Sequence, residues 1–137
     1  MMVEGTWRWV LAVALLAHGV GHVLGLMPLF GVSANGPWHN RSWLLAGGSA
    51  EAVGRWLAPA VWLVAVAAFT VVGLGLLGVG VQGTSWRAWA IVAAVVSAVA
   101  IVVFWHGFPT TFNKVAALAV DGALLWWVLR LPATVAG

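Results

Sequence analysis

Long apolar runs, separated by short polar stretches, dominate the sequence. A helix needs about 20 apolar residues to cross a bilayer, and four runs reach that length, at residues 7–30, 56–81, 86–108 and 112–131. The connection between the first two runs holds an apolar patch too short to span, so segment 38–54 is expected at the membrane interface. The pattern predicts one domain over residues 1–137, an all-α integral membrane four-helix bundle with both termini on one side.

The tryptophans support these boundaries, because tryptophan concentrates at the two membrane interfaces. Most of the 11 tryptophans fall near the ends of the predicted spans, and only Trp62 is placed well inside one. The positive-inside rule does not orient the bundle. Three basic residues fall on each side, Arg8, Arg87 and Arg130 against Arg41, Arg55 and Lys114.

Composition narrows the class of protein further. With 64% hydrophobic and 7% charged residues, the chain has too few polar side chains to cover a water-facing surface. It contains no cysteine, which excludes disulfides, thiolate metal sites and dithiol redox chemistry. The net charge of +3 comes from scattered residues, so anionic lipid headgroups are the expected counter-charges and a nucleic-acid partner is not expected.

The first apolar run is expected to be retained as a span rather than cleaved as a signal peptide. Residues 1–6 contain Glu4 and no basic residue, and the run exceeds the roughly 7–15 apolar residues of a signal peptide. The expected location is therefore the cell membrane, as a multi-pass protein in contact with the lipid bilayer.

Two histidines occupy the middle of this first run. His18 and His22 are four residues apart, so a helix places them on one face. Small residues spaced to let another helix approach closely adjoin them. These are Ala14, Ala17, Gly21 and Gly25. The histidines are therefore expected to border a helix contact rather than to face lipid.

Depth in the membrane relates these histidines to polar residues of the last run. At a rise of about 1.5 Å per residue, His18 lies near the membrane centre and Asp121 within about 2 Å of that level. His22 and Lys114 lie about 6 and 9 Å toward the long connection, and His106 about 13 Å out. An unpaired carboxylate at mid-membrane is costly, so Asp121 is expected to be protonated or partnered, with His18 as the nearest candidate.

These residues favour either acid–base chemistry or metal binding. In an acid–base site, His18 or His22 donates and accepts protons, Asp121 orients the imidazole, and Lys114 with its neighbour Asn113 contacts the ligand or cofactor. In a metal site, His18, His22 and Asp121 are the candidate ligands. The cofactor is left open between a metal ion and a quinone. Haem is less favoured, because His106 lies about 7 Å from the level of His22.

Structural roles compete with these functional ones. The histidines would then be neutral packing contacts to neighbouring helices, Asp121 an interhelix clamp, and Lys114 a side chain extended toward the interface. A di-iron carboxylate site is excluded, since the spans contain a single carboxylate. No phosphate-binding fingerprint occurs among the 17 glycines.

The first span carries a His-Gly-x-x-His-x-x-Gly pattern, which reads His18-Gly19-Val20-Gly21-His22-Val23-Leu24-Gly25. In this pattern the chain resembles a loosely defined group of small, uncharacterised bacterial four-span membrane proteins. The likeness extends to the tryptophan-rich start of the second span and to the exit of the third, and it implies architecture without an activity. In topology alone the chain is also similar to DoxX-like four-helix proteins, some of which are linked to quinone and sulfur redox chemistry.

Two functions follow as expectations. The first is a bundle with an intramembrane polar cavity near His18, His22 and Asp121, which binds a lipophilic, quinone-like ligand or a metal and acts in redox or proton transfer. The second is a non-catalytic membrane subunit or assembly factor, whose small-residue face packs against another copy of the chain or a membrane partner. Whether the chain is an enzyme is left open.

Overall fold

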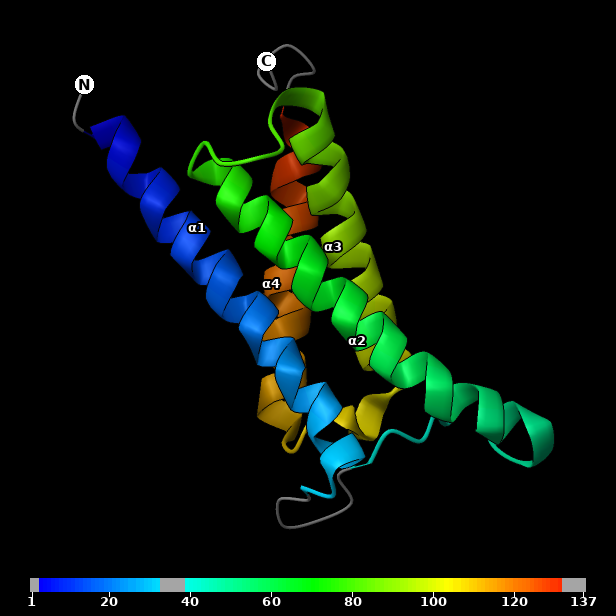
Figure 1. Ribbon diagram of the computed structural model, residues 1–137. Coiled ribbons are helices and arrows are strands. Elements are labelled where there is room, and N and C mark those ends of the chain that lie inside the picture. Colours follow the sequence, from blue (N-terminus) through cyan, green and yellow to red (C-terminus); the bar gives the residue numbers. More distant parts are fainter. Residues whose placement is uncertain (1–2, 33–38, 132–137) are drawn as a thin grey trace.

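The computed structural model describes residues 3–32 and 39–131, and this part of the chain is a bundle of long helices (Figure 1). Its elements are, in chain order, α1 (Val3–Gly21), the 3₁₀ helix η1 (His22–Phe30), α2 (Gly48–Leu76), α3 (Gly83–Val103), the 3₁₀ helix η2 (Trp105–Gly107) and α4 (Thr111–Arg130). The predicted fold class is confirmed.

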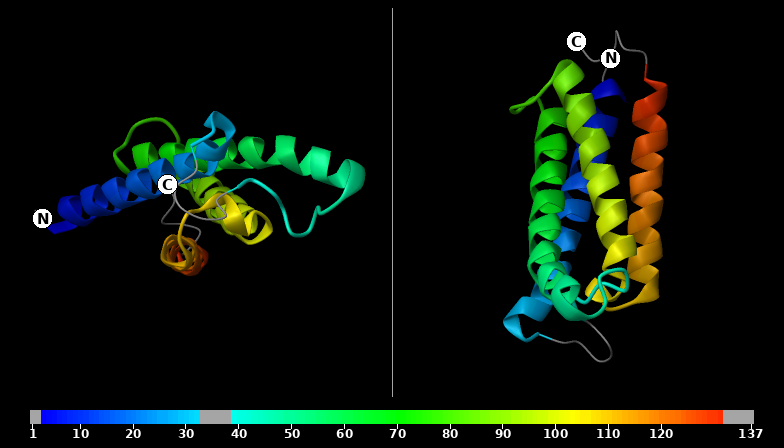
Figure 2. Two further views of the ribbon diagram at one scale, coloured as in Figure 1. Left: turned by 90° about the horizontal axis from the view of Figure 1, so that it is seen from below. Right: turned by 90° about the vertical axis from the view of Figure 1, so that its right-hand side faces the viewer.

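Four helical segments of the described chain are long and apolar enough to cross a membrane. They are Gly5–Phe30, Gly48–Leu76, Thr84–Val103 and Thr111–Arg130. The start of α1 and the end of α4 lie at the same end of the bundle (Figures 1 and 2), as the even number of spans requires. The chain has the architecture of a multi-pass membrane protein.

The first span changes its helical form at the second histidine. The α-helix ends at Gly21, and the chain continues as a 3₁₀ helix from His22 to Phe30. A 3₁₀ stretch of this length inside a span is unusual and is typical of strained or functional positions. Gly31 closes the segment, with a φ of 70° that favours glycine and an N–H directed at the carbonyls of Met27 and Pro28.

The second span is displaced from its predicted position. It begins at Gly48 rather than residue 56, so part of the predicted interfacial segment forms the first turns of α2. These turns project from the bundle (Figure 1), and Trp56, which follows them, is exposed. Residue 38 of that segment lies outside the described residues. The helix ends at Leu76 rather than residue 81, because Gly78 and Gly80 both adopt a φ of 81° that no helix accommodates.

The turn before α4 ends in a threonine cap. The hydroxyl of Thr110 accepts a hydrogen bond from the N–H of Asn113 at 3.2 Å, which caps the first turn of the helix. Phe108 immediately precedes this turn and is buried against the inside of the bundle. The connection therefore places an aromatic side chain and a capped helix start next to the first span.

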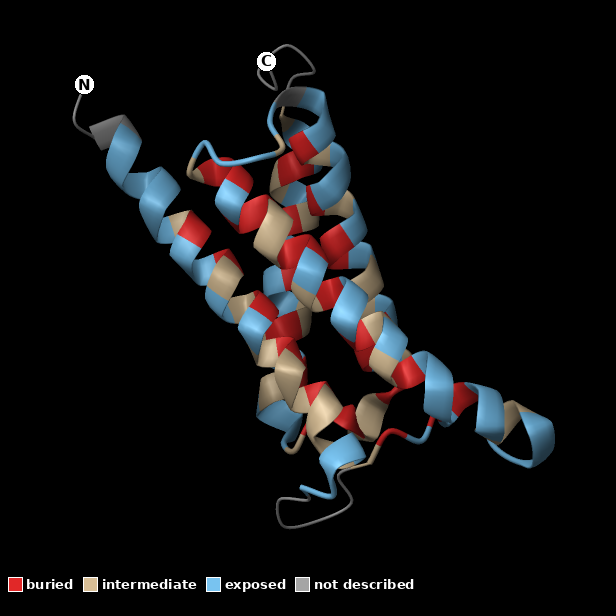
Figure 3. Cartoon of the chain, in the orientation of Figure 1, coloured by how far each residue is buried: buried red, intermediate tan, exposed pale blue. Residues whose placement is uncertain are grey.

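The interior consists of two apolar clusters, one above the other along the bundle. The cluster nearer the termini includes Leu15, Phe69 and Val128, and the cluster nearer the long connection includes Trp62 and Phe104. Apolar side chains cover most of the outer surface, where Figure 3 shows exposed positions along every helix. The buried polar residues of the spans are therefore exceptions inside an apolar interior.

Candidate functional site

The predicted pair of His18 and Asp121 is present in the structure. His18 Nε2 lies 3.0 Å from Asp121 Oδ1, with side chains that are 10% and 1% exposed. The two residues come from α1 and α4, and they meet because both lie near the middle of their spans. A carboxylate in apolar surroundings thus has a direct hydrogen-bond partner, as its burial requires.

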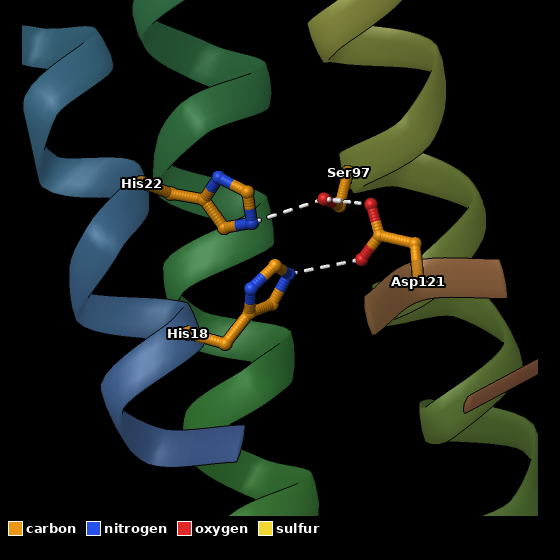
Figure 4. Close-up of polar contacts among 4 residues, drawn as sticks. All are labelled: His18, His22, Ser97 and Asp121. Atoms are coloured by element: carbon orange, nitrogen blue, oxygen red, sulfur yellow. Dashed lines mark hydrogen bonds and ion pairs between the residues drawn. The ribbon is translucent and has the colours of Figure 1, made fainter. Parts of the chain in front are cut away.

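Ser97 of α3 extends this pair into a network of four residues (Figure 4). Its Oγ donates to Asp121 Oδ2 at 2.6 Å and lies 3.0 Å from His22 Nε2. A hydroxyl has one proton to donate, so His22 Nε2 must carry a proton and donate it to Ser97. His18 of α1 and Ser97 of α3 therefore both contact the carboxylate of Asp121, and His22 joins the network through Ser97.

The network also shows which polar residue His22 contacts. Depth alone placed His22 roughly level with Lys114, whereas the hydroxyl of Ser97 connects His22 to Asp121. Lys114 is buried elsewhere, with its Nζ 4.9 Å from the centre of the Trp105 ring. That cation–π contact stabilises the ammonium away from the histidines.

Sequence reasoning missed Ser97, although a signal for it exists. Ser97 is the only serine or threonine in the predicted third span, residues 86–108, and it lies at the midpoint of that span. The depth argument that paired His18 with Asp121 places Ser97 at the same level. A lone hydroxyl at mid-membrane among alanines and valines is therefore the signal to look for.

His22 is packed between aromatic rings and is 1% exposed. Its ring is stacked on Trp62 with an interplanar angle of 20°, and it meets Phe108 edge-on at 5.8 Å. Its Nδ1 is buried without a hydrogen-bond partner and points away from Ser97 (Figure 4). With Nε2 carrying the proton, Nδ1 is an acceptor, and a buried acceptor without a donor marks a strained or functional position.

Trp62 is held in place from the long connection. Its Nε1 donates to Asn40 Oδ1 at 3.3 Å, and Asn40 Nδ2 donates to the carbonyl of Gly25 at 2.8 Å. A Cβ on Gly25 would lie 2.6 Å from the Trp62 ring, so only glycine lets η1 approach this closely. Asn40 therefore links the connection, the first span and the tryptophan beneath His22.

The predicted small-residue contact is present for Gly25 but not for its companions. Ala14 and Ala17 are exposed, and a Cβ on Gly21 would meet no heavy atom within 4 Å. Gly19, which the prediction left out, packs instead, since its Cβ would lie 2.8 Å from that of Phe69. The first span is rotated so that Gly19 and Gly25 face α2, and Gly21 faces open space.

A cavity of about 290 Å³ opens beside the network. We call it the head cavity, and its lining combines two histidines with small and apolar side chains. The lining residues are His18, Gly21, His22, Leu24, Phe108, Asn113, Ala116, Ala117 and Val120. Of the predicted ligand contacts, Asn113 lines this cavity and Lys114 does not. His18 is the more exposed histidine and so the network's route to the cavity.

His39 and His106 form a separate pair at the connection end. Their ring centres are 4.9 Å apart, and the backbone N–H of His39 donates to the backbone carbonyl of His106 at 3.0 Å. Burial lowers the pKa of His39, and the nearby His106 and Arg41 lower it further. His39 Nδ1 accepts from the N–H of Arg41 at 3.2 Å, so the neutral ring is the form that holds the connection in place.

In residues 3–32 and 39–131, no group of three or more histidine, cysteine, aspartate or glutamate side chains is placed to hold a metal ion. In the network, His22 Nε2 and both Asp121 oxygens are engaged in hydrogen bonds. These side chains are therefore better suited to bind a molecule by hydrogen bonds than to coordinate a metal ion.

Comparison with known proteins adds nothing to these observations, because no family model, curated protein or solved structure matches the chain. The resemblance to small bacterial four-span proteins and to DoxX-like proteins therefore stays a prediction.

Proposed function

We propose that this protein binds, in the cell membrane, a lipophilic molecule with a quinone-like ring, whose polar head enters the head cavity and exchanges a proton with His18. The observation that carries the proposal is the network itself. Three of its four polar side chains are buried and His18 is 10% exposed, all four lie in apolar spans, and His18 and His22 line a cavity whose other lining residues are mostly apolar. Buried polar groups in a membrane default to a functional role.

The shape and lining of the cavity favour a small ring. At about 290 Å³ it lies just below the roughly 300–1,000 Å³ that is typical of ligand sites. Phe108 and the imidazoles offer aromatic surfaces, while Gly21 and Ala117 leave room beside them. Asn113 adds a polar side chain at the connection end. An apolar pocket with few polar groups is typical of sites that orient a ligand by its oxygens.

In this proposal each polar residue has a distinct role. Asp121 accepts a hydrogen bond from the Nε2–H of His18, which orients the ring and leaves Nδ1 as its proton acceptor. Ser97 donates to the second carboxylate oxygen and keeps Asp121 from rotating away from His18. His18 then accepts a hydrogen bond from a hydroxyl of the ligand, and proton exchange follows along that bond.

The test is the binding of a short-tailed benzoquinol to protein in lipid nanodiscs, measured by equilibrium dialysis. Its dimethyl ether has no hydroxyl proton, so the wild-type chain should bind the quinol about tenfold more tightly, the value of one hydrogen bond of about 1.4 kcal/mol. His18→Ala should abolish this preference, and His106→Ala, outside the cavity, should keep it. Equal binding of quinol and ether by the wild-type chain would overturn the proposal.

Metal analysis and a visible spectrum of the purified protein test the competing cofactors. A stoichiometric metal that is present in the wild-type chain and lost in His18→Ala would overturn the quinone-like ligand in favour of a metal site. A Soret band would overturn it in favour of haem.

A second function is favoured by one specific observation. Ala14 and Ala17 are exposed and Gly21 is unpacked, so the small-residue face is free to receive a helix of a second copy or of a membrane partner. In that case the chain is a non-catalytic subunit or assembly factor. Ala17→Leu would then shift the oligomeric state in detergent while the benzoquinol preference is absent.

A further inference from the structure

We infer that a groove between α1 and α4 holds the tail of the same molecule, with the tail running from the head cavity toward the end of the bundle where α1 begins. The inference rests on the proposed function, because it takes the head of the ligand to lie beside His18. The groove has a volume of about 950 Å³. Its walls are mainly apolar and include Trp7, Val10 and Ala14 of α1, and Val120, Ala123 and Trp127 of α4.

The groove and the head cavity are neighbours that share a wall. Val120 lines both of them, and Asp121 follows it directly on α4. The groove exists because α1 diverges from the other helices toward its N-terminal end (Figures 1 and 2). A molecule with its head at His18 can therefore pass its tail into the groove without leaving the surface of the protein.

The outer end of the groove lies at an interface. Trp7 and Trp127 meet there edge-on, with ring centres 6.1 Å apart, and tryptophan marks the headgroup level. Trp7 and His18 are eleven positions apart, which is about 16 Å along a helix. That length is about half the roughly 30 Å hydrocarbon thickness of a bilayer, so the groove covers one leaflet.

The polar network at the inner end decides which lipid fits. A phospholipid would place its headgroup at Trp7 and the methyl end of its chain beside His18 and Asp121, where it offers no hydrogen bond. A single-tailed lipid with its polar ring at mid-membrane satisfies both ends, since the ring meets the network and the tail meets apolar walls. The occupant we assign is therefore a ring-headed, single-tailed lipid whose tail points to the Trp7 end.

Photolabelling tests the position of the tail. The probe is a benzoquinol with an alkyl tail of about 16 Å that ends in a diazirine, added to the protein in nanodiscs. Label should appear near Trp7 and Trp127 and saturate with probe. Ala14→Trp fills the groove without touching the network and should lower this labelling about tenfold. The control Ala67→Trp lies on the exposed face of α2, away from the groove, and should leave labelling unchanged.

The other occupants give different results. A phosphocholine lipid that carries the same diazirine tail is the first comparison probe. If it labels the groove equally well in the wild-type and His18→Ala proteins, the groove is a general lipid site and the inference is overturned. Crosslinks between two copies of the chain through the groove overturn it in favour of a helix contact. If the wild-type chain keeps its preference for the quinol over the ether but the tail label is spread over all lipid-facing helices, the position of the tail is overturned and the proposed function stands. If the wild-type chain binds the quinol and the ether equally, the proposed function is overturned as well.

Discussion

Replacing Gly25 with alanine tests how closely the first span is fitted to Trp62. The new Cβ would lie 2.6–2.8 Å from three atoms of the indole ring, closer than carbon atoms approach without a shift. Trp62 has little freedom to move, since it is fully buried, bonded to Asn40 and stacked on His22. Overpacking of this kind costs about 1–3 kcal/mol, and loss of the bond to Asn40 adds about 1 kcal/mol.

Gly21→Ala is the matched control, because it adds the same methyl group four residues earlier in open space. Gly21 has helical dihedral angles, so this change should be neutral or stabilise by about 0.4–1 kcal/mol. The assay is reversible unfolding in mixed micelles, followed by tryptophan fluorescence. If Gly25→Ala unfolds with the same free energy as Gly21→Ala, the close contact between η1 and Trp62 is refuted.

Three further changes act on other parts of the structure. Ser97→Ala leaves two buried hydrogen-bonding atoms without their partner and should lower the free energy of unfolding by about 1–3 kcal/mol in the same assay; an unchanged value contradicts the network. Asp121→Asn keeps the shape of the side chain but puts an amide donor against either His18 or Ser97, so the quinol-over-ether preference should fall toward one in dialysis. His39 has a lowered pKa in the folded chain, so its contribution to stability is complete above about pH 6.5 and is lost as the pH falls toward the folded value. His39→Asn should flatten unfolding free energy measured between pH 7 and 5, and a curve as steep as the wild-type one counts against this role.

The sequence predicts the architecture well, because the physics of a bilayer leaves few choices. Apolar length is enough to predict the four spans, and depth along those spans is enough to pair His18 with Asp121. Trp62 is the one tryptophan that the sequence places well inside a span, and it is the ring on which His22 stacks.

The other features of the site depend on the rotation of each helix about its axis and on the loops between helices. Depth along a span predicts neither of these. The pattern of small residues does not say that α1 turns Gly19 and Gly25, rather than Ala14 and Ala17, toward α2. Helical spacing does not reveal the change to a 3₁₀ helix at His22. Asn40 lies in a connection without periodicity, so its bonds to Trp62 and Gly25 could not be anticipated.

The head cavity as a binding site is the claim on which both proposals depend, and one substitution tests it directly. Gly21 lines the cavity and has open space beside it, so Gly21→Leu fills the cavity without disturbing a packed neighbour. Gly122 also has open space but lies on the exposed side of α4 away from the cavity, which makes Gly122→Leu the matched control. Dialysis of the short-tailed benzoquinol should show binding lost in Gly21→Leu and retained in Gly122→Leu. Equal binding by Gly21→Leu and the wild-type chain would contradict this claim.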